Sequence, residues 1–176
     1  MLVAVPEAEP IVGEWRRRHT HDAPLGLAAH VTLLFPFVPA TRVPEAEERL
    51  ARLIVRRRCF EVSFGSTALW PEVLYLEPEP AEPFAELTAA IAGEWPEHPP
   101  YEGAHETVIP HLTVAESDDA ALLRSIAAEV ELHLPVVAAV TAASVFVEDE
   151  DARWHEHARL PLAEARETPR VVLAGH

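Results

Sequence analysis

The sequence has one cysteine, few basic residues and no long apolar segment. Cys59 is the single cysteine among 176 residues, so an internal disulfide is excluded and nothing indicates an oxidising compartment. The longest weakly polar stretch, residues 134–147, contains Thr141 and Ser144 and is shorter than the roughly 20 apolar residues of a membrane-spanning helix. The N-terminus has no basic region of the kind found in signal peptides. We therefore expect a soluble cytoplasmic protein that does not bind membranes.

Positive charge is also scarce. The sequence contains 14 Lys and Arg residues against 29 Asp and Glu residues, which gives a formal net charge of −15. Proteins that bind long nucleic acids without sequence preference neutralise many phosphates with Lys and Arg, so a DNA duplex is excluded as a partner. The sequence also lacks a Gly-rich phosphate loop, and nothing in it supports hydrolysis of nucleoside triphosphates. A small phosphate ester in a local pocket is compatible with this charge.

What the sequence does have is one short pattern that occurs twice. Residues 29–33 read Ala-His-Val-Thr-Leu, and residues 110–114 read Pro-His-Leu-Thr-Val. Because side chains alternate between the two faces of a β-strand, the His and the Thr of each pattern point to the same side. The apolar residues between and after them point to the other side. The sequence therefore predicts two strands, each with one imidazole and one hydroxyl on the same face.

Periodicity and turn residues predict an α+β protein with one domain. The predicted strands cover residues 2–6, 28–35, 59–64, 68–77, 108–115, 135–148 and about 155–162, with a turn near Gly65 and Ser66. The predicted helices cover residues 9–18, 43–57, 82–94 and 118–131. Read in order, this suggests an internal duplication, with lobe-forming halves near residues 1–66 and 67–165 and a tail at 166–176. The alternative is an ordinary α+β domain in which the repeated pattern is coincidental.

With these motifs the chain resembles the 2H phosphoesterase superfamily, in particular the branch of 2′-5′ RNA ligase-like proteins and cyclic phosphodiesterases. The similarity rests on residues 30–37 and 110–114, and residues 154–162 resemble the terminal strand of that family. The resemblance implies a bilobal, internally duplicated fold. Two mostly antiparallel sheets would face a central cleft, with the helices outside. It further implies chemistry without a metal or other cofactor on 2′,3′-cyclic phosphates or 2′-5′ phosphodiesters.

The resemblance assigns the catalytic roles to four residues. His30 and His111 are predicted to share the general acid and general base roles, because histidine titrates closest to neutral pH. The sequence does not decide which histidine has which role. Thr32 and Thr113 are predicted to donate hydrogen bonds to the phosphate oxygens, where negative charge grows in the transition state. The reverse reaction, in which a hydroxyl is the nucleophile, would make the protein a 2′-5′ RNA ligase.

Four further residues are candidates for binding the rest of the substrate. Phe37 and Tyr75 are aromatic candidates for stacking on a base. Arg153 precedes the last predicted strand and is a candidate source of positive potential, and His105 lies in a loop that leads to the second motif. Phe35 has the same strand parity as Val31, so we expect it in the core instead.

Several alternatives stay open at this stage. The partner is expected to be a nucleotide or a short RNA end with a cyclic phosphate, bound by a monomer. The acidic composition makes an ADP-ribose cyclic phosphate an alternative substrate. A noncatalytic nucleotide- or RNA-binding module is an alternative from another class of function. The His-x-His pairs at residues 19–21 and 155–157 have a spacing that can bind a metal, but they lack a further ligand set, and we interpret them as surface histidines.

Overall fold

The computed structural model describes residues 1–103 and 108–164. Its strands are β1 (Leu2–Ala4), β2 (His30–Thr32), β3 (Phe60–Trp70), β4 (Val73–Glu79), β5 (Leu112–Glu116), β6 (Val136–Val140), β7 (Ala142–Glu148) and β8 (Trp154–Pro161). Its α-helices are α1 (Glu9–His19), α2 (Val43–Ile54), α3 (Glu82–Glu94) and α4 (Ala120–Glu131). Short 3-10 turns occupy η1 (Pro6–Ala8), η2 (Ala23–Leu25), η3 (Ala40–Arg42) and η4 (Pro100–Gly103). The predicted α+β class is confirmed.

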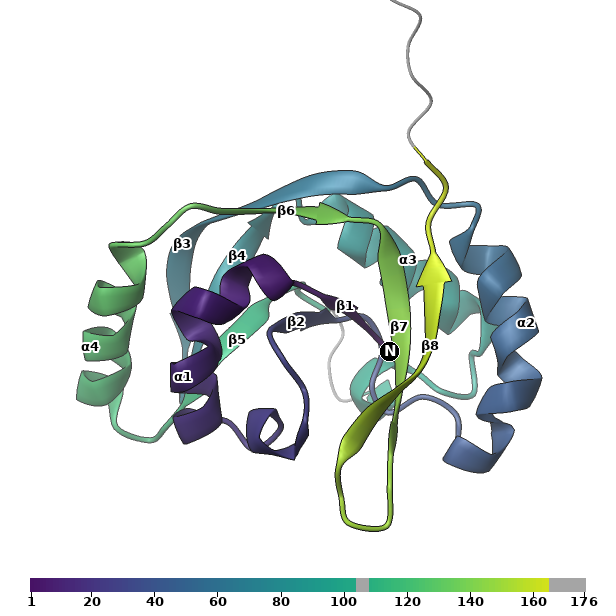
Figure 1. Ribbon diagram of the computed structural model, residues 1–176, viewed down its shortest axis with the longest axis horizontal. Coiled ribbons are helices and arrows are strands. Elements are labelled where there is room, and N and C mark those ends of the chain that lie inside the picture. Colours follow the sequence, from purple (N-terminus) through teal and green to yellow (C-terminus); the bar gives the residue numbers. More distant parts are fainter. Residues whose placement is uncertain (104–107, 165–176) are drawn as a thin grey trace, which may run out of the picture.

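Two antiparallel sheets of four strands form the centre of the molecule (Figure 1). One sheet has the order β2-β1-β7-β8, and the other has the order β5-β4-β3-β6. The two strands that carry or follow the motif histidines, β2 and β5, are edge strands of different sheets, and they lie next to each other. The fold therefore brings the two motifs together where the two sheets meet.

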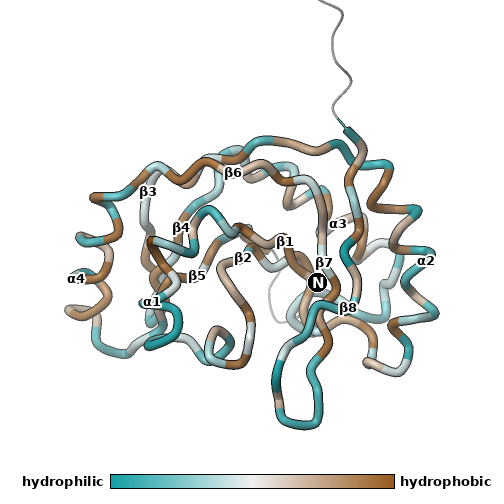
Figure 2. Tube along the Cα trace, in the orientation of Figure 1, coloured by the Kyte–Doolittle hydropathy of each residue, from teal (hydrophilic) through white to brown (hydrophobic). Residues whose placement is uncertain are grey.

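The helices lie outside the sheets in two pairs. Helices α1 and α4 contact each other at one end of the molecule, and α2 and α3 contact each other at the opposite end (Figure 1). Helix α2 buries residues at helical spacing, among them Ala46, Leu50 and Ile54. Helix α4 begins after the N-cap residue Asp119, whose carboxylate accepts hydrogen bonds from the backbone amides of Ala121 and Leu122. The apolar segments gather between helices and sheets (Figure 2).

The structure corrects two predicted boundaries. The predicted turn near Gly65 and Ser66 is instead an irregularity within β3, where the pairing with β4 shifts register between Phe64 and Thr67. The turn comes at Glu72, whose φ of 67° is the left-handed conformation that reverses the chain. The predicted strand 135–148 is divided at Thr141 into β6 and β7, which belong to different sheets.

The sheets do not follow the order of the sequence. Strands β7 and β8, near the end of the described chain, complete the sheet that β1 and β2 begin. Position 66, the predicted limit between the two halves, lies within β3. The division into halves of 1–66 and 67–165 stays a prediction. None of the helices in the described ranges is long and apolar enough to cross a membrane.

Candidate active site

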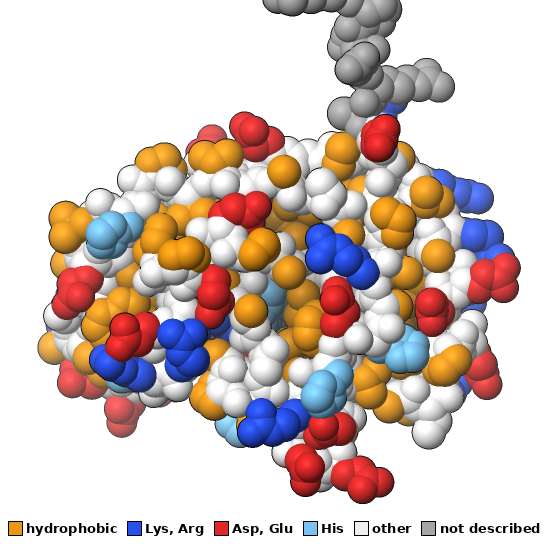
Figure 3. Space-filling model, in the orientation of Figure 1, with side chains coloured by type: hydrophobic (Ala, Val, Ile, Leu, Met, Phe, Trp, Pro, Cys, Tyr) orange, Lys and Arg blue, Asp and Glu red, His pale blue; other side chains and the backbone are white. Residues whose placement is uncertain are grey.

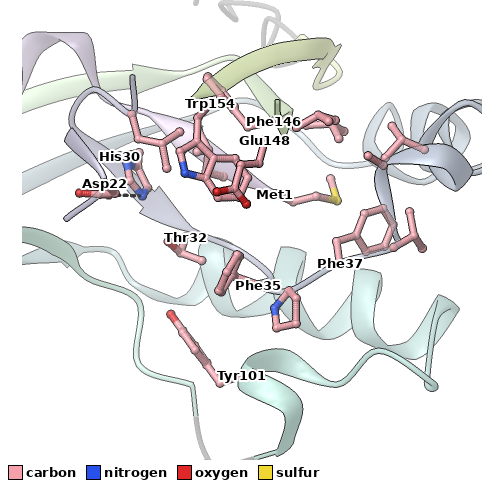
Figure 4. A pocket seen from close by; sticks show the side chains of 18 of the residues that line it. Met1, Asp22, His30, Thr32, Phe35, Phe37, Tyr101, Phe146, Glu148 and Trp154 are labelled. Carbon is pink, nitrogen blue, oxygen red and sulfur yellow. Dashed lines mark ion pairs between the residues drawn. The ribbon is translucent and has the colours of Figure 1, made fainter. Parts of the chain in front are cut away.

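The two motifs line one cavity of about 800 Å³. Figure 4 shows the part of this cavity that includes His30 and Thr32. His30 and Thr32 come from β2, His111 directly precedes β5, and Thr113 is the second residue of β5. Residues two apart in extended backbone project from the same face, which explains why the His and the Thr of each motif face the same side. The structure thus places two imidazoles and two hydroxyls, from edge strands of different sheets, around the same space.

Both histidines are held by the same backbone contact. Nδ1 of His30 lies 2.8 Å from the carbonyl oxygen of Ala28, and Nδ1 of His111 lies 2.8 Å from that of Ile109. A carbonyl oxygen only accepts hydrogen bonds, so each Nδ1 carries the hydrogen and donates it. In the neutral ring, Nε2 is then the nitrogen with the free lone pair. Each histidine is therefore fixed in the tautomer that can take a proton at Nε2.

The two rings have different surroundings. Burial lowers the pKa of His30 to about 4, and the nearby Arg16 contributes to this shift. The carbonyl of Ala28 and the carboxylate of Asp22, whose Oδ2 lies 3.8 Å from Nε2, oppose the shift. His30 is therefore neutral at neutral pH.

Among the described residues, no charged group acts on His111 as Arg16 and Asp22 act on His30. Burial lowers its pKa, and the hydrogen bond to Ile109 opposes this effect. Its ring packs edge-on against Trp70 at 4.7 Å and against Tyr75 at 5.7 Å between ring centroids. The aromatic contacts fix the orientation of the ring.

A buried arginine connects the two motifs. The Arg16 side chain is 1% exposed, and its guanidinium donates hydrogen bonds to the carbonyl oxygen of Thr113 at 2.5 Å and to that of Leu27 at 3.3 Å. It also forms an ion pair with Asp22 at 2.9 Å. One guanidinium from α1 therefore contacts the second motif, the loop before the first motif, and the carboxylate that faces His30.

Asp22 is fixed from several sides. Besides the pair with Arg16, it accepts a hydrogen bond from the hydroxyl of Thr20 at 2.6 Å. Burial by itself would raise its pKa, but the charge of Arg16 and the Thr20 hydroxyl outweigh burial and lower it. Asp22 is thus an ionised carboxylate beside Nε2 of His30 (Figure 4).

Aromatic side chains form one wall of the cavity. Phe35 and Trp154 lie in an edge-on contact with 6.1 Å between ring centroids, and both line the cavity with Tyr101 (Figure 4). The backbone amide of Tyr101 donates a hydrogen bond to the carbonyl of Phe35 at 2.7 Å, and its side chain is hydrogen-bonded to that of Thr32. The predicted core position of Phe35 is wrong: its side chain is 49% exposed, because β2 ends at Thr32 and the strand alternation ends with it.

The other predicted substrate-binding residues have different locations. Phe37 lines the cavity and packs edge-on against Trp95. Tyr75 is buried beside the His111 ring and is not among the described residues that line the cavity. Arg153 is exposed in the hairpin between β7 and β8 and likewise does not line it. His105 lies outside the described residues.

In the His-x-His pair at 155–157, each histidine lies beside one carboxylate. Nε2 of His155 is 2.5 Å from Oδ2 of Asp149, and Nε2 of His157 is 3.3 Å from Oε2 of Glu47. Within residues 1–103 and 108–164, no group of three or more His, Cys, Asp or Glu side chains is arranged to hold a metal ion.

Sequence patterns did not indicate Asp22, Tyr101, Glu116 or Trp154, and they indicated Arg16 only as one of several arginines that could lend positive potential to a phosphate site. Arg16 belongs to a run of three arginines at a helix end, for which the favourable interaction with the helix dipole is the ordinary explanation. Asp22 and Tyr101 lie in loops, whose course the sequence does not fix. The one usable signal was the position of Asp22 and Tyr101 before the two motifs, in the loops that lead to them.

Comparison with known proteins identifies the family of the chain. The family model of the 2′-5′ RNA ligase superfamily matches residues 4–152. The chain belongs to this superfamily. The membership confirms the predicted relationship to the 2H phosphoesterases and indicates an enzyme. No curated protein matches the sequence.

Solved structures share the fold at low sequence identity. TT0787 of Thermus thermophilus is 19% identical, with 93% of this chain and 96% of that chain covered and a TM-score of 0.59. E. coli LigT complexed with 3′-AMP is 19% identical, with 92% and 95% covered and a TM-score of 0.57. LigT complexed with phosphate is 20% identical at the same coverage and TM-score. These likenesses confirm the predicted bilobal fold.

Proposed function

We propose that this protein is a metal-independent phosphodiesterase. It opens a 2′,3′-cyclic phosphate, or cleaves a 2′-5′ phosphodiester, of a nucleotide or RNA end. The observation that carries the proposal is the single cavity lined by both His-x-Thr motifs, with each Nδ1 occupied by a backbone carbonyl. This leaves both Nε2 atoms available beside one phosphate, one to take a proton from water and the other to give a proton to the leaving sugar oxygen.

The different surroundings support different roles for the two histidines. His30 is neutral because burial and Arg16 lower its pKa to about 4, so it is the general base that takes a proton from water. Within the part of the chain that the structure describes, no cation acts on His111, and a bound phosphate raises its pKa, so it is the general acid. The water oxygen forms a bond to phosphorus, the bond from phosphorus to one sugar oxygen breaks, and His111 gives its proton to that oxygen.

The remaining side chains stabilise the charges that this step creates. Asp22 lies beside Nε2 of His30 and stabilises the imidazolium that forms there. Thr32 and Thr113 are fixed on strands and donate hydrogen bonds to the nonbridging oxygens, on which negative charge increases. In the reverse direction the roles of the histidines exchange, and a hydroxyl as nucleophile gives 2′-5′ ligation.

A nucleotide is the ligand that fits the rest of the cavity. Phe35 and Trp154 present exposed ring faces and edges beside the motif residues, and a base can stack there. E. coli LigT, which shares the fold, has been crystallised with 3′-AMP and with phosphate. These complexes support a nucleotide as the ligand of this chain as well.

The test is turnover of a panel of 2′,3′-cyclic nucleotides in excess EDTA. We expect the wild-type protein to be active, and His30→Ala and His111→Ala to lower kcat by about 10²–10⁴, the usual effect of losing a general acid or base. His133→Ala is the matched control, because His133 is exposed after α4 and is not among the residues that line the cavity. Near-native turnover by either cavity variant would contradict the two-histidine mechanism. Tight binding without turnover would indicate a noncatalytic module, and loss of activity in EDTA would indicate a metal.

A further inference from the structure

A bulge in β5 turns an acidic side chain into the cavity. Thr113 pairs with Tyr75 of β4, but the next residue of β4, Leu74, pairs with Ala115, so β5 has one extra residue between them. Strand alternation would place Glu116 on the face opposite Thr113. Because of the extra residue, Glu116 instead has the same orientation as Thr113 and lines the cavity.

The described residues that line the cavity include carboxylates but no side chain that is always positively charged. Of its carboxylates, Asp22 is neutralised by the ion pair with Arg16. Glu116 and Glu148 also line it, and neither has an ion-pair partner among the residues that the structure describes. No Lys or Arg side chain in the described ranges lines the cavity. In these ranges the groups that can become positively charged are therefore the histidines that line the cavity and the α-amino group of Met1, a lining residue, whose pKa burial lowers to about 5.

The two unpaired carboxylates lie on different parts of the cavity. Glu116 is close enough to Asp22, Arg16 and His21 for their charges to act on it: burial raises its pKa, Asp22 raises it further, and Arg16 and His21 oppose this. Glu148 ends β7 and lies near Trp154, next to the acidic tip of the hairpin between β7 and β8 (Figures 3 and 4). A phosphate between the motifs is thus exposed to negative potential from both sides.

We propose that Glu116, supported by Glu148, makes this cavity select a phosphodiester with one negative charge over a phosphomonoester with two. The inference rests on the proposed function and specifies its substrate class. A 2′,3′-cyclic phosphate carries one negative charge. Its hydrolysis breaks one ester bond and leaves a monoester, which carries between about −1.5 and −2 charges near pH 7. The carboxylates therefore repel the more highly charged product more strongly than the substrate, which weakens binding of the product and favours its release.

The experiment compares two ligands that differ by one methyl group and one charge. They are 2′-deoxyadenosine 3′-(methyl phosphate), a diester that cannot cyclise because it has no 2′-hydroxyl, and 2′-deoxyadenosine 3′-phosphate. Their Kd values are measured by calorimetry at about pH 8, where the monoester is doubly charged. The proteins are the wild type, Glu116→Gln, Glu148→Gln and the control Glu61→Gln. Glu61 is an exposed glutamate of β3 outside the cavity lining.

We expect the wild type to bind the diester about tenfold more tightly than the monoester, because like charges in a partly enclosed site repel. Glu116→Gln should reduce this ratio to about threefold or less by strengthening binding of the monoester, Glu148→Gln should reduce it less, and Glu61→Gln should leave it unchanged. Equal wild-type affinities, or an unchanged ratio in Glu116→Gln and in Glu148→Gln, would overturn the charge selection and leave hydrolysis of cyclic phosphates intact. Binding of neither ligand to the wild type would overturn the proposed function as well.

Discussion

Replacement of Arg16 by methionine tests how the two motifs are held together. Methionine keeps much of the length of the side chain but removes the charge and all the hydrogen bonds. The change leaves Asp22 without its cation and the carbonyls of Thr113 and Leu27 without this donor. Removing one partner of a buried ion pair costs about 3–5 kcal/mol. Because the Asp22 side chain is 31% exposed and regains some hydration, we expect the low end of this range, about 3 kcal/mol.

The assay is thermal unfolding followed by calorimetry or circular dichroism. A loss of about 3 kcal/mol in a chain of this size corresponds to a decrease in Tm of about 6–12 °C. Arg18→Met is the control, because Arg18 lies on the same helix but is 60% exposed and pairs only with Glu14, which is 64% exposed. Exposed ion pairs contribute at most about 1 kcal/mol, so this variant should unfold within about 2–4 °C of the wild type.

A double-mutant cycle separates the ion pair from the other contacts of Arg16. Asp22→Asn alone leaves Arg16 buried without a counterion, and the double variant removes both charges together. If the pair is coupled as the 2.9 Å distance indicates, the double variant should lose less stability than the sum of the two single variants. A Tm for Arg16→Met equal to that of Arg18→Met, or strictly additive effects in the cycle, would refute the reasoning.

Three further outcomes follow from the site. The pKa of His30 is about 4 in the folded protein and about 6.5 when unfolded, so the unfolded chain binds the proton first. The free energy of unfolding should therefore fall by about 3 kcal/mol between about pH 6.5 and pH 4, and urea titrations should show this loss in the wild type but not in His30→Gln. Because Asp22 raises the pKa of His30, Asp22→Asn should shift the acidic limb of the kcat/KM profile to lower pH, and an unmoved or raised limb would contradict this. Phe35→Ala should raise KM for a cyclic nucleotide by about 10–100-fold with a smaller effect on kcat, whereas the cyclic phosphate of ribose, which has no base to stack, should be unaffected.

The fold was largely predictable because its elements have strong local signals. The order of strands and helices follows from apolar periodicity, and the start of α4 follows from the capping residue Asp119. The partners of each strand do not follow from local signals. Residues 135–148 form one apolar run in the sequence, and only the paths of β1 and β3 decide that its first part joins one sheet and its second part the other. Tertiary pairing overrides the continuity of the pattern there.

The same distinction applies to the site. The shared face of His and Thr within each motif follows from a pattern of period two, which is a local property, whereas the meeting of the two motifs in one cavity depends on the packing of β2 beside β5. Glu116 could not be found in this way, because a bulge reverses strand parity and leaves no mark in the sequence. Phe35 shows the converse error, in which alternation was extended past the end of β2. Local rules therefore fail at the ends and irregularities of strands, and in this protein those positions face the cavity.

The two halves of the site use one backbone arrangement for two chemical roles. Each imidazole donates from Nδ1 to the carbonyl two residues before it, so the tautomer is the same on both sides. The difference arises first from the deeper burial of His30 and second from Arg16, which also lowers the pKa of His30 while its guanidinium donates to the carbonyl of Thr113 on the other strand. The side chain that joins the two motifs therefore also adds to their chemical inequality. A symmetric pair of histidines would compete for the same proton, and an unequal pair can begin the reaction with one ring neutral and the other protonated.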